Sequence, residues 1–170
     1  MKNLVLFSLI FMLISCFGNK NEFGVLKIDA PKGSTFKDEV MKNGVHFYSI
    51  KWKLKNEMTS VFSISKWPNE MSTSEMAPSV KEIIEDTFAV TKAQGKSKIE
   101  DDTKIQYSEI SEEFVSGNVA YFEHTSERGY QRILSVHMVS DGDVIWQGLF
   151  SGSKELFKEA MNIFKTMEPQ

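Results

Sequence analysis

Across residues 105–150, strand-like segments carry apolar side chains at both their odd and their even positions. This feature constrains the fold most strongly. The strand-like segments are 105–115, 118–126, 130–140 and 143–150. Successive side chains of a strand point to opposite faces, so this pattern predicts an antiparallel meander with two apolar faces, and other elements must cover both. One face carries Tyr121, Ile133, Val139, Val144, Trp146 and Phe150. The other carries Ala120, Phe122, Leu134, Val136, Met138, Ile145 and Leu149.

Turn residues divide the meander. The predicted turns are Ser116-Gly117, Glu127-Arg128-Gly129 and Asp141-Gly142. Asp-Gly between two apolar strands is a strong signal for a two-residue hairpin turn. It predicts Val139 opposite Val144, and His137 opposite Trp146.

Three more strands precede the meander, at 25–30, 45–55 and 60–67. In the second of these, one face carries His46, Tyr48, Ile50, Trp52 and Leu54. The other face carries a basic row of Lys51, Lys53 and Lys55, either a contact for anionic lipid head groups or a solvated strand face. Residues 34–43 are predicted as a polar connection.

Two helices complete the predicted elements. The first runs over 78–95, with Pro78 in its first turn and Gly95 as its stop. The second runs over 153–167, with Ser153 as its N-cap. Its apolar stripe is Leu156, Phe157, Ala160, Met161 and Phe164. The fold class is therefore α+β, an antiparallel sheet of about six to seven strands flanked by helices on both faces.

This order of elements resembles the Mog1/PsbP-like fold over most of residues 24–168. The stretch Ala30-Pro31-Lys32-Gly33 after the first strand and the closing helix with Phe157 and Phe164 carry the resemblance. It implies an α/β/α sandwich and a binding or assembly factor without a catalytic site. It assigns no functional residue.

The chain opens with Lys2 and an apolar run over residues 4–14. The last two residues of this run, with the two that follow, read Leu13-Ile14-Ser15-Cys16. The run has the length of a signal-peptide core, about 7–15 residues, and falls short of the roughly 20 that a spanning helix needs. These four residues resemble the lipobox of bacterial prolipoproteins, in which the cysteine is acylated before cleavage. The alternative is an ordinary secretory signal with an incidental cysteine.

The lipobox resemblance implies a signal peptide at 1–15, a lipidated Cys16 with a tether to residue 22, and one globular domain over 23–170. Diacylglycerol and an N-acyl chain such as palmitate on Cys16 would anchor the protein in a membrane. Phe17 rather than Asp after the cysteine favours the outer membrane, facing the periplasm. In a host with one membrane, the same signal implies its outer surface. No second cysteine is present, so no intramolecular disulfide forms.

The formal charge of −3 is small and mixed, which disfavours a nucleic-acid partner. We expect a monomer that contacts an envelope protein. Methionines Met58, Met71 and Met76 fall in predicted loops, where they could form an adaptable binding surface or pack locally.

Few residues suggest catalysis or metal binding. Ser34 and Lys37 match the Ser-x-x-Lys nucleophile motif of penicillin-binding proteins. The same spacing recurs at Ser63 and Ser151, and no Lys-Thr-Gly accompanies it, so we predict no enzyme. His46, His124 and His137 lack metal-ligand spacing, so no metal or cofactor is predicted. His124 should face Arg132 across a hairpin.

Three functions remain open from the sequence. The first is a non-enzymatic interaction or assembly module of the cell envelope. The second is a small-ligand carrier with a pocket between sheet and helix, which should show an unfilled apolar cavity. The third, and least favoured, is a Ser-x-x-Lys hydrolase.

Overall fold

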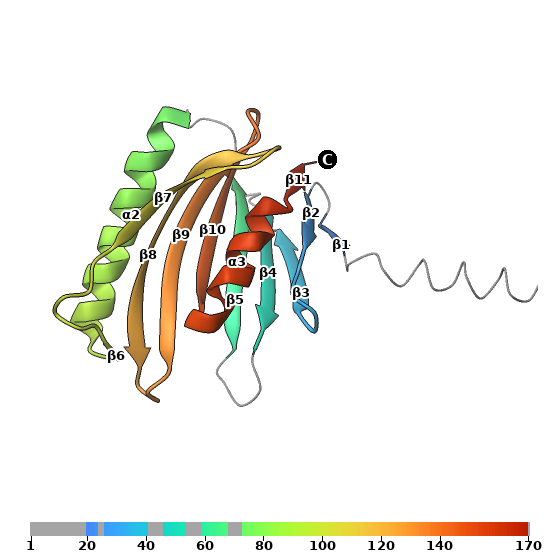
Figure 1. Cartoon of the computed structure of the whole chain (residues 1–170). Helices are drawn as coiled ribbons and strands as arrows, with labels where there is room; N and C mark the ends of the chain where they lie inside the picture. The colour runs from blue at the N-terminus through green and yellow to red at the C-terminus, as the bar shows by residue number, and fades with distance from the viewer. Residues whose placement is uncertain (1–19, 24–25, 41–45, 54–58, 68–72, 170) are drawn as a thin grey trace, which may run out of the picture.

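The computed structural model describes residues 20–23, 26–40, 46–53, 59–67 and 73–169. Its main sheet comprises β3 (Thr35–Val40), β4 (His46–Trp52), β5 (Ser60–Trp67), β6 (Ser97–Lys98), β7 (Gln106–Ser111), β8 (Ser116–Ser126), β9 (Gln131–Ser140) and β10 (Ile145–Ser153). The strand order is β3-β4-β5-β10-β9-β8-β6, and β7 pairs with β8 beside this path. All the pairings are antiparallel, and the sheet curls into a half-barrel (Figure 1).

A small second sheet and the helices complete the fold. The small sheet has the order β1-β2-β11, with bounds Lys20–Phe23, Leu26–Asp29 and Glu168–Pro169. Helix α2 spans Thr73–Gln94, and a 3-10 turn, η1 (Lys154–Leu156), leads into helix α3 (Phe157–Lys165). The α+β class and the antiparallel sheet are as predicted. The main sheet has eight strands rather than six to seven, and the strand predicted at 25–30 lies in the small sheet, as β2.

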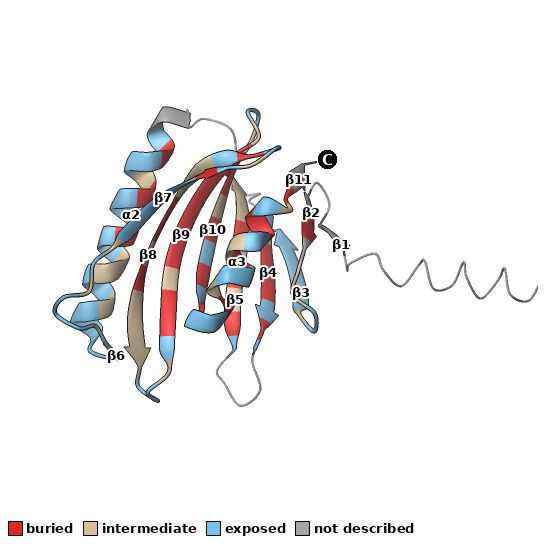
Figure 2. Cartoon of the chain, in the orientation of Figure 1, coloured by how far each residue is buried: buried red, intermediate tan, exposed pale blue. Residues whose placement is uncertain are grey.

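Two clusters of buried side chains hold the elements together. Figure 2 shows where the buried residues lie along the strands and helices. Helix α3 and strand β2 pack in one cluster with Tyr121, Val139 and Trp146 of the meander. Helix α2 packs in the other with Phe122 and Met138. The residues of the two clusters alternate along β8, β9 and β10, because successive side chains of a strand point to opposite faces. Both predicted faces are assigned correctly, except that Leu149 stays 42% exposed.

Residues 35–40 form a strand rather than the predicted polar connection. Strand β3 pairs with β4 from Thr35 opposite Lys51 to Val40 opposite His46. Of its six side chains, only Phe36 is partly buried. An edge strand held by its backbone ladder needs no apolar alternation, so residues 35–40 carry no strand pattern.

The predicted turn at Ser116-Gly117 was wrong. Both residues belong to β8, and the chain reverses earlier, where the Glu112 N–H donates to the Val115 carbonyl. A Cβ on Gly117 would clash with the Met138 carbonyl on the neighbouring strand. This glycine therefore permits a close strand approach rather than a turn.

The last hairpin has a longer loop than predicted. Val139 lies opposite Trp146, and His137 lies opposite Gly148, a shift of two residues that keeps every side chain on its predicted face. The carboxylate of Asp141 explains the length, since its Oδ1 accepts from the N–H groups of Asp143 and Val144 at 2.9 and 2.8 Å. This Asx turn stabilises a loop between Ser140 and Ile145.

Both helices differ from prediction at their N-termini. Helix α2 begins at Thr73, so Pro78 lies inside it rather than in its first turn. Gly95 ends it with a φ of 64°, as predicted. Ser153 precedes the 3-10 turn and makes no side-chain cap. Met76, predicted in a loop, is buried in α2, whereas Met58 and Met71 lie outside the described residues.

Substituting Gly142 by valine should lower the free energy of unfolding by about 1–3 kcal/mol. Gly142 has a φ of 102°, a conformation that a β-branched residue adopts only with strain. Thermal denaturation measures the effect. Gly142→Asn is the matched control and should lower the free energy of unfolding by less, because asparagine tolerates positive φ. An unchanged melting temperature for Gly142→Val would contradict the turn.

Candidate functional site

Helix α2 leaves an open groove along one flank. Its buried residues Met76, Val80 and Ile84 pack over β8 and β9. Beside this contact, a groove of about 880 Å³ opens between α2 and strands β7 and β8. Its lining residues are Ala77, Pro78, Val80, Lys81, Tyr107, Ser108, Glu109, Asn118 and Val119.

The groove combines an apolar floor with polar walls. Val80 of α2 is buried, whereas Tyr107 is 51% exposed. The Tyr107 hydroxyl donates to Oε1 of Glu85 at 3.3 Å. Partial burial, and then the nearby Glu85 carboxylate, raise the pKa of Tyr107. The phenol therefore stays protonated at neutral pH and keeps its donor. Such a surface offers apolar contact and directional hydrogen bonds together.

A smaller opening of about 290 Å³ lies on the other flank of α2. Ile83 and Thr87 of the helix face Leu134 and the exposed Leu149 across it. Under the helix, Phe88 packs edge-on against Phe122 at 5.0 Å between ring centroids. Both openings are surface grooves flanking a packed seam.

The predicted anchor and part of the basic row lie outside the described residues. These are Leu13, Ile14, Ser15 and Cys16, together with Lys55. Lys51 is exposed on β4, and Lys53 is exposed directly after it. Strand β4 lies toward the β1 side of the fold (Figure 1).

The Ser-x-x-Lys residues are not arranged as a helical pair. The Ser34 hydroxyl donates to the Pro31 carbonyl at 2.6 Å and closes a turn. Lys37 lies on strand β3, where it pairs with Glu39. The lysine therefore does not follow the serine by one helical turn, which is the arrangement that the motif requires.

The three histidines lie apart. His46 is exposed and stacks on Tyr48. His137 is fully buried beside Ser135, and burial lowers its pKa to about 3. His124 lies opposite Arg132, as predicted. Burial and then the charge of Arg132 lower the pKa of His124.

Within the described parts of the chain, no group of three or more His, Cys, Asp or Glu side chains is placed to hold a metal ion. None of the helices there is long and apolar enough to cross a membrane. Sequence reasoning missed the groove at Tyr107, because its shape depends on where α2 crosses the sheet. The exposed aromatic in a strand was its only signal.

Comparisons with known proteins add little. No protein-family model and no curated protein matches the chain. One similar solved structure is that of LpqN, described as involved in cell envelope biogenesis of Mycobacterium tuberculosis. It shares 15% identity, with a TM-score of 0.35, over 82% of this chain and 86% of that one. A similarity at this level carries no argument for fold or function.

Proposed function

We propose that this protein is a lipid-anchored module of the cell envelope that binds a protein partner without catalysing a reaction. The observation that carries the proposal is the groove between α2 and β7, with half-exposed Tyr107. An open groove with an apolar base and polar rim suits a polypeptide segment. Tyrosine is among the residues that most often dominate such contacts.

The finer fold assignment belongs to the same proposal. We infer an α/β/α sandwich of the Mog1/PsbP-like kind, with α2 and α3 on opposite faces of the sheet. The alternation of the two core clusters along β8, β9 and β10 supports it. Binding or assembly factors are common in that fold, in agreement with the proposed role.

Site-specific photo-crosslinking tests the groove. We expect p-benzoylphenylalanine at position 107, in the full lipidated chain, to capture one defined envelope protein. The same residue at Lys158, exposed on α3, is the matched control and should capture none. Purified partner and Tyr107→Ala protein should then bind at least tenfold more weakly than wild type, the loss of about 1.4 kcal/mol or more typical of an aromatic hot spot. Equal binding by Tyr107→Ala would contradict the proposed surface.

The anchor is tested separately. Cys16→Ser should abolish lipid attachment and cleavage, because only the thiol accepts the diacylglycerol. Metabolic labelling with a fatty-acid analogue should show complete loss of label. Ser15→Ala is the matched control and should remain labelled, since alanine is a usual lipobox residue. Continued labelling of Cys16→Ser would overturn the anchor.

We propose that the basic row holds the anchored domain against the membrane surface. Lys51, Lys53 and Lys55 would contact anionic head groups, because β4 lies toward the β1 side of the fold (Figure 1), and β1 begins at Lys20, soon after Cys16 in the sequence. Each lysine near an anionic surface contributes roughly 1 kcal/mol.

A small-ligand carrier is the second candidate function. The groove volume of about 880 Å³ is within the range of small-molecule sites. Native mass spectrometry of protein extracted from membranes separates the two candidates. A bound small molecule displaced by Tyr107→Trp would favour a carrier, whereas ligand-free protein that still crosslinks favours the interaction module.

A further inference from the structure

Two edge strands of the main sheet differ in how they are protected against pairing with another chain. Strand β3 carries three successive charged residues, Lys37, Asp38 and Glu39. Charged side chains on an edge strand oppose the addition of a further strand. Strand β7, which lies along the edge of β8, has six residues with no proline and a single charge, that of Glu109. The β7 edge is therefore the less protected of the two.

The backbone of β7 directs alternate residues away from β8. The Glu112 N–H donates to the Val115 carbonyl at 2.9 Å in the turn that joins the two strands. From this pair the antiparallel register continues without a break along the whole of β7. Hydrogen-bonded and non-hydrogen-bonded pairs alternate along such a ladder. The residues whose N–H and C=O groups face outward are therefore Tyr107, Glu109 and Ser111.

These outward groups are open to a new strand. Among the described residues, β7 pairs with β8 alone, and no other backbone group bonds to it. The Glu109 carbonyl accepts only from the hydroxyl of its neighbour Ser108, at 3.4 Å, and a carbonyl oxygen has a second lone pair. The edge thus presents a donor and an acceptor at every second residue, which is the spacing that an added strand needs.

The same edge borders the groove beside α2. Tyr107 and Glu109 lie opposite Ala120 and Asn118 of β8, and Ala120 is buried under α2. Both side chains therefore belong to the α2 face of the sheet. Ser108, which belongs to the other face, also lines the groove, so the backbone edge of β7 forms one wall. Every second side chain of an added strand would enter the groove.

The facing wall favours uncharged side chains. The apolar residues that α2 contributes to it are Ala77, Pro78 and Val80. Lys81 and Glu109 are the charged lining residues, one of each sign. The nearby Glu85 carboxylate already accepts from the Tyr107 hydroxyl. Small β-branched side chains fit an apolar wall and also favour the extended backbone.

We propose that an extended segment of the partner adds to β7 as an antiparallel strand, with small β-branched apolar residues at every second position directed into the groove. The inference rests on the proposed function and specifies how the partner is held. Main-chain hydrogen bonds with Tyr107, Glu109 and Ser111 supply the pairing, since each outward residue can both donate and accept. The groove selects the side chains.

A synthetic peptide tests this mode of binding. The probe is acetylated and amidated Lys-Thr-Val-Thr-Val-Thr-Lys, in which the valines alternate with threonine and the lysines keep the peptide soluble. Titrated into the ¹⁵N-labelled full chain, it should give saturable shifts along β7 and slow the amide hydrogen exchange of Tyr107, Glu109 and Ser111. The amides of Ser108 and Ile110 already face β8 and should change little. The same peptide N-methylated at both valines cannot donate to β7 and should bind at least tenfold more weakly.

An exposed alanine on α2 tests the contribution of the groove. Ala77→Arg places a long side chain among the lining residues and should weaken peptide binding about tenfold. Ala89→Arg changes another exposed alanine of the same helix, away from the groove lining, and should leave binding unchanged. Both variants should fold, because arginine has a high helix propensity.

Each other outcome overturns the strand. Absence of saturable peptide binding, equal binding by the N-methylated peptide, or binding without slower exchange at the three outward amides would reject it. Protection of these amides in the peptide-free chain, rising with its concentration, would assign the edge to a second copy of this chain instead. Crosslinking at position 107 is a separate readout. Capture of a partner there, together with any of these results, would keep the proposed function and reject only the strand mode, whereas peptide binding without capture would reject the envelope partner alone.

Discussion

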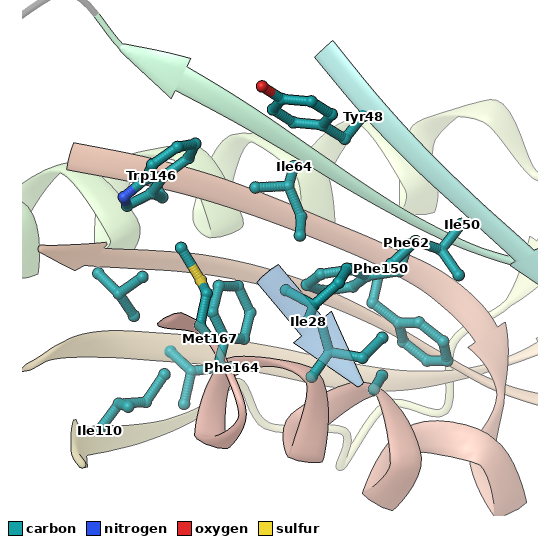
Figure 3. Close-up of a cluster of buried hydrophobic side chains, with 14 of the residues drawn as sticks. Ile28, Tyr48, Ile50, Phe62, Ile64, Ile110, Trp146, Phe150, Phe164 and Met167 are labelled. Carbon is teal, nitrogen blue, oxygen red and sulfur yellow. The ribbon is translucent and has the colours of Figure 1, made fainter. Parts of the chain in front are cut away.

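Phe164→Ala should lower the free energy of unfolding by about 3–5 kcal/mol, the cost of removing a large aromatic side chain from a packed core. Phe164 is fully buried where α3 meets the sheet (Figure 3). Its ring packs edge-on against Phe62 at 5.1 Å and stacks on His137 at 4.6 Å between centroids. Gly148 lies directly beneath it, and a Cβ there would clash with the ring.

The chain offers a control of the same residue type. Phe114 is 51% exposed, so Phe114→Ala should cost less than about 1 kcal/mol. Urea denaturation followed by circular dichroism measures both variants. Similar midpoints for the two would show that α3 does not pack on the sheet as described.

Acidification should destabilise the protein through His137. Its pKa is about 3 in the folded protein, lowered by burial, against 6.5 for the free side chain. Between these values the unfolded chain binds a proton that the folded chain does not, so this stabilisation is complete above pH 6.5 and falls as pH falls toward 3. The loss is about 1.4 kcal/mol per pH unit and about 4–5 kcal/mol over the whole range.

The structure shows why His137 resists protonation. It lies on the same face of β9 as Ser135, whose Oγ is 2.6 Å from its Nε2, and its Nδ1 has no partner among the described residues. Phe62 and Phe164 pack against its ring. A charged imidazolium would be desolvated there without a counter-ion.

Stability measured from pH 7.5 to 4.5 in wild type and His137→Gln tests this dependence. In His137→Gln, the free energy of unfolding should fall less steeply with decreasing pH than in wild type, even if the variant is less stable at every pH. A wild-type slope in His137→Gln would show that other groups cause the acid sensitivity.

The sequence by itself determined the elements whose side chains alternate or recur strongly. It assigned both faces of the meander, the strand over 60–67 and the stop of α2 at Gly95. It also paired His124 with Arg132. These features follow from local periodicity and turn chemistry, which a single chain segment carries within itself. The lipid anchor at Cys16 is a prediction of the same local kind and remains to be tested.

Tertiary structure alone decided the features that depend on neighbours. Strand β3 forms because its backbone pairs with β4. Strand β11 forms because its backbone pairs with β2. Gly117 lets β8 approach the backbone of Met138, a residue distant in sequence, where a Cβ would clash. The groove at Tyr107 arises where α2 lies beside β7 and β8. The physical basis of these features is packing between segments far apart in the chain, which no local pattern encodes.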